Sequence, residues 1–333
     1  MRIAVFGTGG AGGYFGARLA RAGEDVTFIA RGEHLNAIRE RGLTVETPAG
    51  EIVPAMDRGL LDAAEFNNAT SDRILGFADV AKVCMLQSYH QNAEQLEITF
   101  NKTRFDALPD RMKVIIENGV EAASQLASVL GADRVVGGLC GTLSWVVGPG
   151  RIRSIGGVHF VKIGELDNRA SERVERLRRA FERAGVDVEI PSDIHRALWE
   201  KFLFVVSLGG VGAVARAPVG VLRTVPETRR MLMRCMEEIL AVARAREVPM
   251  VDSIVAEKMA LVDSLAPDGT TSLQRDIVDG KPSELEAWNG AVVRLGREAG
   301  VPTPLHGFLY ESLLPQERRA RGGPASGAAE SPA

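Results

Sequence analysis

The clearest chemical pattern in the chain lies at its beginning, where glycines recur at the spacing of a phosphate-binding turn. The pattern GxGxxG is formed by Gly7, Thr8, Gly9, Gly10, Ala11 and Gly12. An apolar run over 3–6 precedes it, a helical pattern over 11–22 follows, and a second apolar run covers 26–30. This order predicts a β-α-β unit whose helix N-terminus binds a dinucleotide pyrophosphate. The alternative is a structural glycine-rich turn.

An arginine ends the second predicted strand, where NAD sites usually carry an acidic residue for the ribose 2′-hydroxyl. The strand ends Phe28-Ile29-Ala30-Arg31, whereas Asp25 precedes it and is wrongly placed for the ribose. Because a guanidinium pairs well with a phosphate, Arg31 predicts NADP (NADPH) as the cofactor. The alternative is an exposed surface arginine.

A single lysine, Lys201, lies in an apolar helical stretch that reads WEKFLFVVSL. Partial removal from water disfavours the ammonium form of a lysine and moves its pKa toward the range useful for general-acid catalysis. Lys201 is therefore a candidate catalytic acid. The alternative is a lysine at the helix edge that reaches solvent or pairs with Glu200.

Three further residues occupy positions typical of binding sites. Asn118 follows a predicted strand over 114–116, and ligands bind at the carboxyl ends of such strands. Ser272 and Glu284 flank a predicted short helix and the turn 280–282. The alternatives are a plain Asn-Gly turn at 118 and, at Glu284, the start of the next helix.

Composition narrows the class of protein. The chain has 333 residues, enough for two domains, and a net charge of −3 gives no sign of a nucleic-acid or membrane-surface partner. No signal peptide or bilayer-spanning run is expected, and no metal-ligand spacing is seen among the five histidines and three cysteines. We therefore expect a cytoplasmic protein that binds no metal.

The elements that must position these residues form two groups. Alternating strands and helices fill the first part, with a hairpin over 43–46 and 51–54 and an antiparallel edge formed by 143–147, 151–154 and 159–163. After Pro191 nearly every segment has helical period, as in 194–208, 227–246, 250–266 and 285–299. We predict an α/β Rossmann domain (1–190), an all-α substrate and catalytic domain (191–314) and a disordered tail (315–333).

Taken together, these features resemble the ketopantoate reductase (2-dehydropantoate 2-reductase) family, from the first strand to about Tyr310. The stretches that carry the resemblance are GTGGAGGYFGARLARAGEDVTFIARGEHLNAIRERGL, Asn118-Gly119, LWEKF and TTSLQRDIVDGKPSELEAWNG. The resemblance implies a helical second domain like that of 6-phosphogluconate dehydrogenase. It also implies an enzyme of pantothenate biosynthesis that transfers hydride from NADPH to the ketone carbon of a 2-keto acid.

The same resemblance implies roles for individual residues. Arg31 would bind the 2′-phosphate, and Asn118 would help to hold nicotinamide and substrate. Lys201 would bind the substrate and donate the proton. Ser272 would hold the substrate carboxylate, and Glu284 would contact a substrate hydroxyl as part of the catalytic set.

Three positions depart from the family pattern. Gln87, a cofactor-binding candidate, stands where the family often has lysine, and Val205 and Gly209 stand where it often has asparagines. Residues 60–110 also match poorly. The substrate is therefore 2-dehydropantoate or, in a family relative, another 2-keto compound. A non-catalytic NADP-binding sensor is the third reading, against which Lys201, Ser272 and Glu284 argue. A homodimer is compatible with the apolar helical domain.

Overall fold

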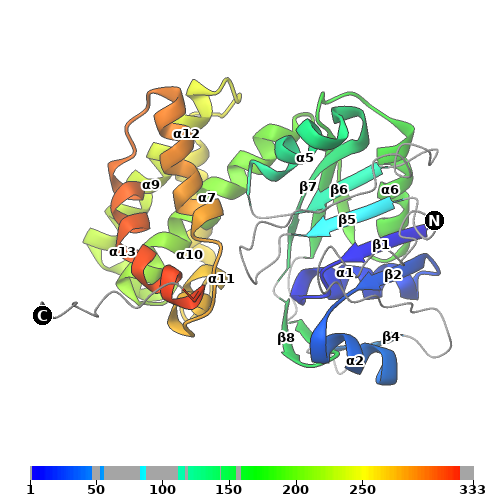
Figure 1. Ribbon diagram of the computed structural model, residues 1–333. Coiled ribbons are helices and arrows are strands. Elements are labelled where there is room, and N and C mark those ends of the chain that lie inside the picture. The colour runs from blue at the N-terminus through cyan, green and yellow to red at the C-terminus, as the bar shows by residue number, and fades with distance from the viewer. Residues whose placement is uncertain are drawn as a thin grey trace, which may run out of the picture. The chain divides into compact units, whose positions relative to one another are not determined.

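The computed structural model describes residues 2–46, 53–55, 83–87, 112–116, 119–142, 144–154 and 159–322. These residues form two compact units (Figure 1). The first comprises the described residues up to 116 together with 121–197, and the second comprises 119–120 and 198–322. The first unit combines sheets with helices and the second is helical, which confirms the predicted fold class.

A seven-stranded sheet with the order β11-β10-β7-β6-β5-β1-β2 forms the centre of the first unit. Its strands are β1 (Arg2–Phe6), β2 (Asp25–Ile29), β5 (Val83–Gln87), β6 (Met112–Ile116), β7 (Val135–Gly141), β10 (Phe160–Glu165) and β11 (Asp187–Glu189). The strands from β2 to β7 pair in parallel, and β10 is antiparallel to β7. The parallel strands therefore end at one edge of the sheet, where Rossmann folds bind their ligands.

A separate four-stranded sheet has the order β4-β3-β9-β8. Its strands are β3 (Leu43–Glu46), β4 (Val53–Ala55), β8 (Ser144–Gly148) and β9 (Arg151–Ser154). The predicted hairpin is confirmed, because β3 and β4 pair antiparallel. The predicted antiparallel edge of the first sheet is confirmed for β10, which pairs with β7. It is wrong for β8 and β9, which belong to the second sheet. Glu46 accepts hydrogen bonds from both Arg151 and Arg153 across β3 and β9.

The helices of the first unit pack on these sheets through their apolar faces. They are α1 (Gly10–Arg21), α2 (Gly32–Arg41), α5 (Ala122–Leu130) and α6 (Glu172–Arg183). A short 3-10 turn, Ala132–Arg134, follows α5 and buries no residue. In α6 the Ser171 hydroxyl caps the N-terminus by accepting from the N–H of Val174. The apolar positions Val174, Leu177 and Phe181 recur at helical spacing and are buried in the core of the unit.

The second unit contains only helices among its described residues. They are α7 (Ile194–Ala215, which begins in the first unit), α8 (Val219–Thr224), α9 (Pro226–Ala245), α10 (Ile254–Ser264), α11 (Ser272–Val278), the π-helical turn η3 (Glu286–Gly290), α12 (Ala291–Ala299) and α13 (Pro304–Ala320). The predicted helix over 285–299 thus begins as a π-helical turn.

Helix α7 corrects one expectation. Its 22 residues are apolar and long enough to cross a bilayer by length and composition, although no such run was expected. However, 72% of its most apolar window is buried within the protein, so α7 is a core helix. Its apolar composition follows from packing on several sides, because a helix that is apolar around much of its circumference must be covered.

The start of the predicted disordered tail is also wrong. Helix α13 continues through Pro315 to Ala320. Leu313 and Glu317 are buried on its inner side, so the last turns are held by packing and by hydrogen bonds to Glu317. These contacts offset the backbone hydrogen bond that a proline inside a helix cannot donate. Residues 323–333 lie outside the described part of the chain.

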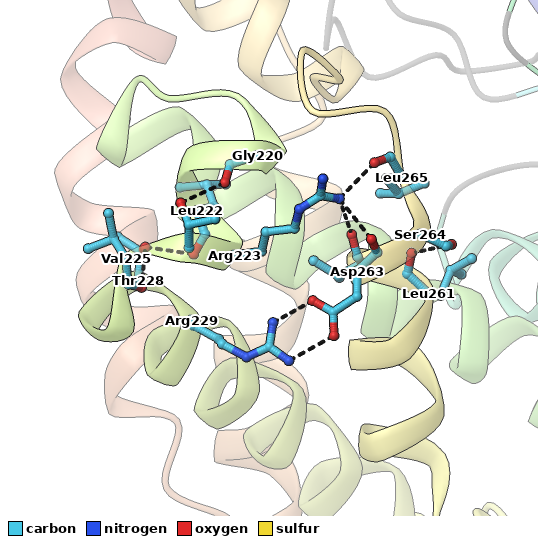
Figure 2. Close-up of polar contacts among 12 residues, drawn as sticks. Gly220, Leu222, Arg223, Val225, Thr228, Arg229, Leu261, Asp263, Ser264 and Leu265 are labelled. Carbon is cyan, nitrogen blue, oxygen red and sulfur yellow. Dashed lines mark hydrogen bonds and ion pairs between the residues drawn. The ribbon is translucent and has the colours of Figure 1, made fainter.

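Two arginines join the helices α8, α9 and α10 (Figure 2). Arg223 of α8 donates to the backbone carbonyls of Val262, Asp263 and Leu265 at 3.1, 3.0 and 2.7 Å. Val262 and Asp263 belong to the last turn of α10 and Leu265 is its C-cap, a region where helix carbonyls lack intrahelical donors. The Val262 carbonyl also accepts from the N–H of Leu265 at 3.3 Å. Arg229 of α9 forms a paired hydrogen bond with the Asp263 carboxylate, at 2.5 and 2.8 Å. The cluster fixes the end of α10 against the two preceding helices.

Candidate active site

The glycine-rich turn has the backbone that a dinucleotide site requires. Gly7 has a φ of +88°, a left-handed value that only glycine adopts without strain. Its N–H donates to the carbonyl of Ile29 at 3.1 Å, and this bond ties the turn to the end of β2. The pyrophosphate-binding candidates of the turn and Arg31 after β2 therefore lie at the same edge of the sheet.

The start of α1 offers open N–H groups beside free space. Its N-cap residue, Gly9, provides no side-chain hydrogen bond, and the first turn carries no acidic residue. A Cβ built on Gly9 meets nothing within 4 Å, whereas one on Gly10 would lie 2.0 Å from the carbonyl oxygen of Ser144. The space above Gly9, the uncapped N–H groups and the helix dipole fit a pyrophosphate.

Arg31 occupies the position expected of a 2′-phosphate ligand. It is exposed, adopts an extended backbone and forms the N-cap of α2 directly after β2. Asp25 begins β2 and lies at the opposite end of that strand. Gln87 is the last residue of β5, and its backbone pairs with Ile116 of β6 at the ligand-binding edge. Asn118 lies outside the described residues.

His34 is a residue near this site that the sequence pattern did not single out. Its Nε2 lies 2.9 Å from the carbonyl oxygen of Thr8, in the glycine-rich turn. Its Nδ1 accepts from the N–H of Gly150, in the turn between β8 and β9, also at 2.9 Å. One side chain of α2 therefore contacts two segments that are far apart in the sequence.

In the second unit, Lys201 lies on a half-buried stripe of α7. Phe202 and Leu203 are fully buried, but Lys201, Phe204 and Val205 are only half-buried. The spacing i, i+3 and i+4 places these three on one face of α7. The surface next to the Lys201 stem on this helix is thus apolar.

The elements that carry Ser272 and Glu284 converge on α7 two turns beyond Lys201. A Cβ built on Gly209 would lie 2.6 Å from Cζ3 of Trp288 and 3.3 Å from Cδ2 of Leu273. Leu273 is the neighbour of Ser272, and the N–H of Trp288 donates to the carbonyl of Glu284 at 2.9 Å. The structure therefore brings the segments of all three predicted residues onto one helix of the second unit.

Local hydrogen bonds set the positions of Ser272 and Glu284. Ser272 is the half-buried first residue of α11, whose N-cap Thr271 accepts from the N–H of Gln274 at 3.2 Å. Glu284 is 6% exposed and begins the turn that leads into η3. The bond from Trp288 shows that Glu284 does start the following helical segment. This structural role is compatible with a contact to the substrate.

The π-helical turn contains polar groups that the sequence did not indicate. Both amide atoms of Asn289 and Nε1 of Trp288 are buried without a hydrogen-bond partner in the described part of the chain. Asn289 lies directly against α7, because a Cβ on Gly210 would be 2.5 Å from its Nδ2. π-Helical turns are frequent at functional sites. The five residues 286–290 carry no propensity signal from which this turn was predictable.

Comparisons with known proteins agree over both units. Residues 3–65 match the family model of ketopantoate reductase PanE/ApbA, and residues 193–317 match that of its C-terminal region. The chain is 28% identical over 306 residues to the 2-dehydropantoate 2-reductase of Halobacterium salinarum, which covers 92% of this chain and 95% of the relative.

Solved structures share the whole fold. The PanE/ApbA family ketopantoate reductase from Ralstonia eutropha JMP134 has 26% identity and a TM-score of 0.79, and the match covers 96% of this chain and 100% of that chain. D-mandelate dehydrogenase, solved with NADH and anilino(oxo)acetate, has 20% identity and a TM-score of 0.81, with 96% and 99% covered. Because the identity to D-mandelate dehydrogenase is only 20%, this match shows a shared fold and nothing more.

Proposed function

The chain belongs to the ketopantoate reductase family, and from this premise we propose that it reduces 2-dehydropantoate to pantoate with NADPH. Membership establishes an oxidoreductase that uses a nicotinamide dinucleotide. The substrate, the preference for NADPH and the acid are the proposal. The observation that carries it is the convergence on α7, where segments bearing Ser272 and Glu284 pack two turns from Lys201.

The first unit would hold the cofactor. The N–H groups at the start of α1 bind the pyrophosphate, and the exposed Arg31 guanidinium pairs with the 2′-phosphate. Gln87 and Asn118, which follow or end neighbouring strands, are proposed to lie nearer the nicotinamide. Bound NADPH supplies the hydride for the ketone carbon.

The second unit would supply the acid and the substrate contacts. The Lys201 ammonium donates a hydrogen bond to the ketone oxygen, stabilises the negative charge that develops there and transfers its proton to that oxygen. Ser272 donates to the substrate carboxylate. The Glu284 carboxylate accepts from a substrate hydroxyl, and its near-complete burial strengthens that bond by lowering the local dielectric.

A second candidate substrate is a 2-keto acid with an apolar side chain. Two observations favour it. Val205 and Phe204 make the stripe beside Lys201 apolar, and the indole of Trp288 fills the space at Gly209. The family often has amides at 205 and 209, and loss of such groups changes discrimination between polar and apolar substrates by large factors.

The deciding experiment measures oxidation of NADPH and NADH by the purified chain with a panel of 2-keto acids. The panel contains 2-dehydropantoate, a 2-keto acid with a branched aliphatic side chain and one with an aromatic side chain. The proposal predicts the highest kcat/KM for NADPH with 2-dehydropantoate. A higher value for an apolar 2-keto acid would select the second candidate, and absence of turnover with every ketone would reject both.

A further inference from the structure

His34 makes two hydrogen bonds whose direction fixes the chemical state of its ring. The carbonyl of Thr8 can only accept, so Nε2 must carry a proton, and the N–H of Gly150 can only donate, so Nδ1 must be bare. His34 is therefore a neutral imidazole with both nitrogens satisfied. The ring is half-buried, and this partial removal from water lowers its pKa, which also favours the neutral form.

The Thr8 bond acts on the backbone of the phosphate-binding turn. Thr8 is 4% exposed and lies between Gly7, which needs a left-handed backbone, and Gly9, the N-cap of α1. Glycines leave a turn with more conformational freedom than any other residue. A hydrogen bond from outside the turn therefore limits the conformations available at its centre.

The bond from Gly150 joins the second sheet to the His34 ring. Gly150 is buried with a φ of +72°, and a Cβ built there would lie 3.1 Å from Cβ of Ala37 in α2. Its carbonyl accepts from the N–H of Thr44 at 2.8 Å. The turn between β8 and β9 is thus a rigid support for the His34 ring.

His34 also lies one turn from the predicted 2′-phosphate ligand. Arg31 is the N-cap of α2 and His34 belongs to its first turn, so the two move with the same helix end. The ring therefore connects the turn that would bind the pyrophosphate to the helix end that would bind the adenosine ribose.

We infer that His34 is a positioning residue for the dinucleotide, which holds the Gly7–Gly12 turn at Thr8 in register with the Arg31 end of α2. It acts through Thr8 and does not touch the reacting atoms. This inference rests on the proposed cofactor site. Its consequence is a contribution to dinucleotide affinity with little contribution to the rate of hydride transfer.

Three substitutions separate the two bonds. His34→Leu removes both while keeping a side chain of similar size. His34→Gln places an amide NH2 group near the position of Nε2, where it can donate to Thr8, and His34→Asn is one methylene shorter, so its amide oxygen can accept from Gly150 while its NH2 group does not reach Thr8. Dissociation constants for NADPH and NADH are measured by titration for each variant, with kcat at saturating cofactor and thermal unfolding beside them. His195→Leu is the control, because His195 makes a comparable bond, 2.8 Å to the carbonyl of Leu166, away from the turn.

For His34→Leu and His34→Asn we expect at least tenfold weaker binding of the preferred dinucleotide, with kcat within about twofold of the wild type. His34→Gln restores most of the affinity, and His195→Leu leaves it unchanged. The inference would be overturned if all three His34 variants bound the dinucleotide as tightly as the wild type. It would also be overturned if His34→Gln bound the dinucleotide as weakly as His34→Leu. If the wild type bound NADH more tightly than NADPH, only the proposed preference for NADPH would be wrong. If it bound neither dinucleotide, both the proposed function and the role of His34 would be wrong.

Discussion

The backbone N–H and the hydroxyl of Ser283 both donate to the carboxylate of Glu317, at 3.1 and 2.6 Å. Arg321 completes the contact, because it donates to the Glu317 carboxylate at 2.6 Å and to the carbonyl of Ser283 at 2.7 Å. Ser283 and Glu317 are buried. The N–H, the hydroxyl and the carbonyl of Ser283, the residue before Glu284, are thus all hydrogen-bonded to the end of α13.

Replacing Glu317 with alanine should therefore destabilise the second unit and loosen the turn at Glu284. Removing the buried carboxylate leaves the Ser283 groups and the partly exposed Arg321 guanidinium without an acceptor, which costs up to about 3–5 kcal/mol. We expect a loss of that size in the free energy of urea unfolding, with a raised KM for the keto substrate. Glu298→Ala is the control, since its exposed pair with Arg246 should be worth under about 1 kcal/mol. Equal effects of the two substitutions would contradict the buried role of Glu317.

A second prediction concerns acid stability and His306. This side chain is fully buried, and burial lowers its pKa to about 3. In the unfolded chain a histidine has a pKa of about 6.5, so between the two pKa values the unfolded state binds more protons than the folded state. Stability from the neutral ring is present above about pH 6.5 and is lost as the pH falls toward 3, by up to about 1.4 kcal/mol per pH unit.

His306→Leu should remove this dependence while leaving the side-chain volume similar. The measurement is the urea midpoint of both proteins from pH 7 to pH 4. The wild type should lose stability faster than the variant as the pH falls below 6.5. Parallel curves for the two proteins would show that His306 is not the titrating group.

The close approach of Trp288 to Gly209 gives a third prediction. A Cβ at 209 would lie 2.6 Å from the indole, so Gly209→Ala should overpack the interface and cost about 1–3 kcal/mol. Gly307→Ala is the matched control within helix α13, where nothing lies within 4 Å of the new Cβ. There alanine should stabilise by up to about 1 kcal/mol because it favours the helix.

A double-mutant cycle tests whether the indole is the cause. Shortening Trp288 to leucine should make the added methyl group at 209 much less harmful, with a coupling free energy of about 1 kcal/mol or more. Additive effects of the two substitutions would place the strain at 209 elsewhere.

The cofactor preference is tested at Arg31. Arg31→Ala should weaken NADPH binding at least tenfold and NADH binding by less than about twofold, because only NADPH carries the 2′-phosphate. Arg39→Ala is the control, an exposed arginine in the last turn of the same helix. Equal losses for NADPH and NADH would reject the phosphate contact.

The sequence predicted the parts of the fold that local patterns determine. The turn at Gly7, the β-α-β unit and the amphipathic helix α6 depend on glycine spacing and on apolar periods within a few residues. The second sheet was missed because its strands come from distant parts of the chain: Glu46 pairs with Arg151, 105 residues away. No local pattern reports such a pairing.

The candidate site divides in the same way. Arg31, Lys201, Ser272 and Glu284 were predicted from motifs, and the structure brings the segments of the last three together on α7. His34 was missed because its partner Gly150 is 116 residues away. The last turns of α13 were missed because Pro315 and the following composition favour a coil locally, while burial of Glu317 decides in favour of the helix.

Turnover of Lys201→Met decides whether Lys201 is the acid in the reduction of a keto group. The measurement compares kcat for NADPH oxidation with the preferred 2-keto acid in this variant and the wild type, with the NADPH dissociation constant determined for both. We expect a fall in kcat of about 10²–10⁴-fold, as for a lost general acid, with NADPH affinity unchanged. A kcat within a few-fold of the wild type would show that Lys201 is not the acid.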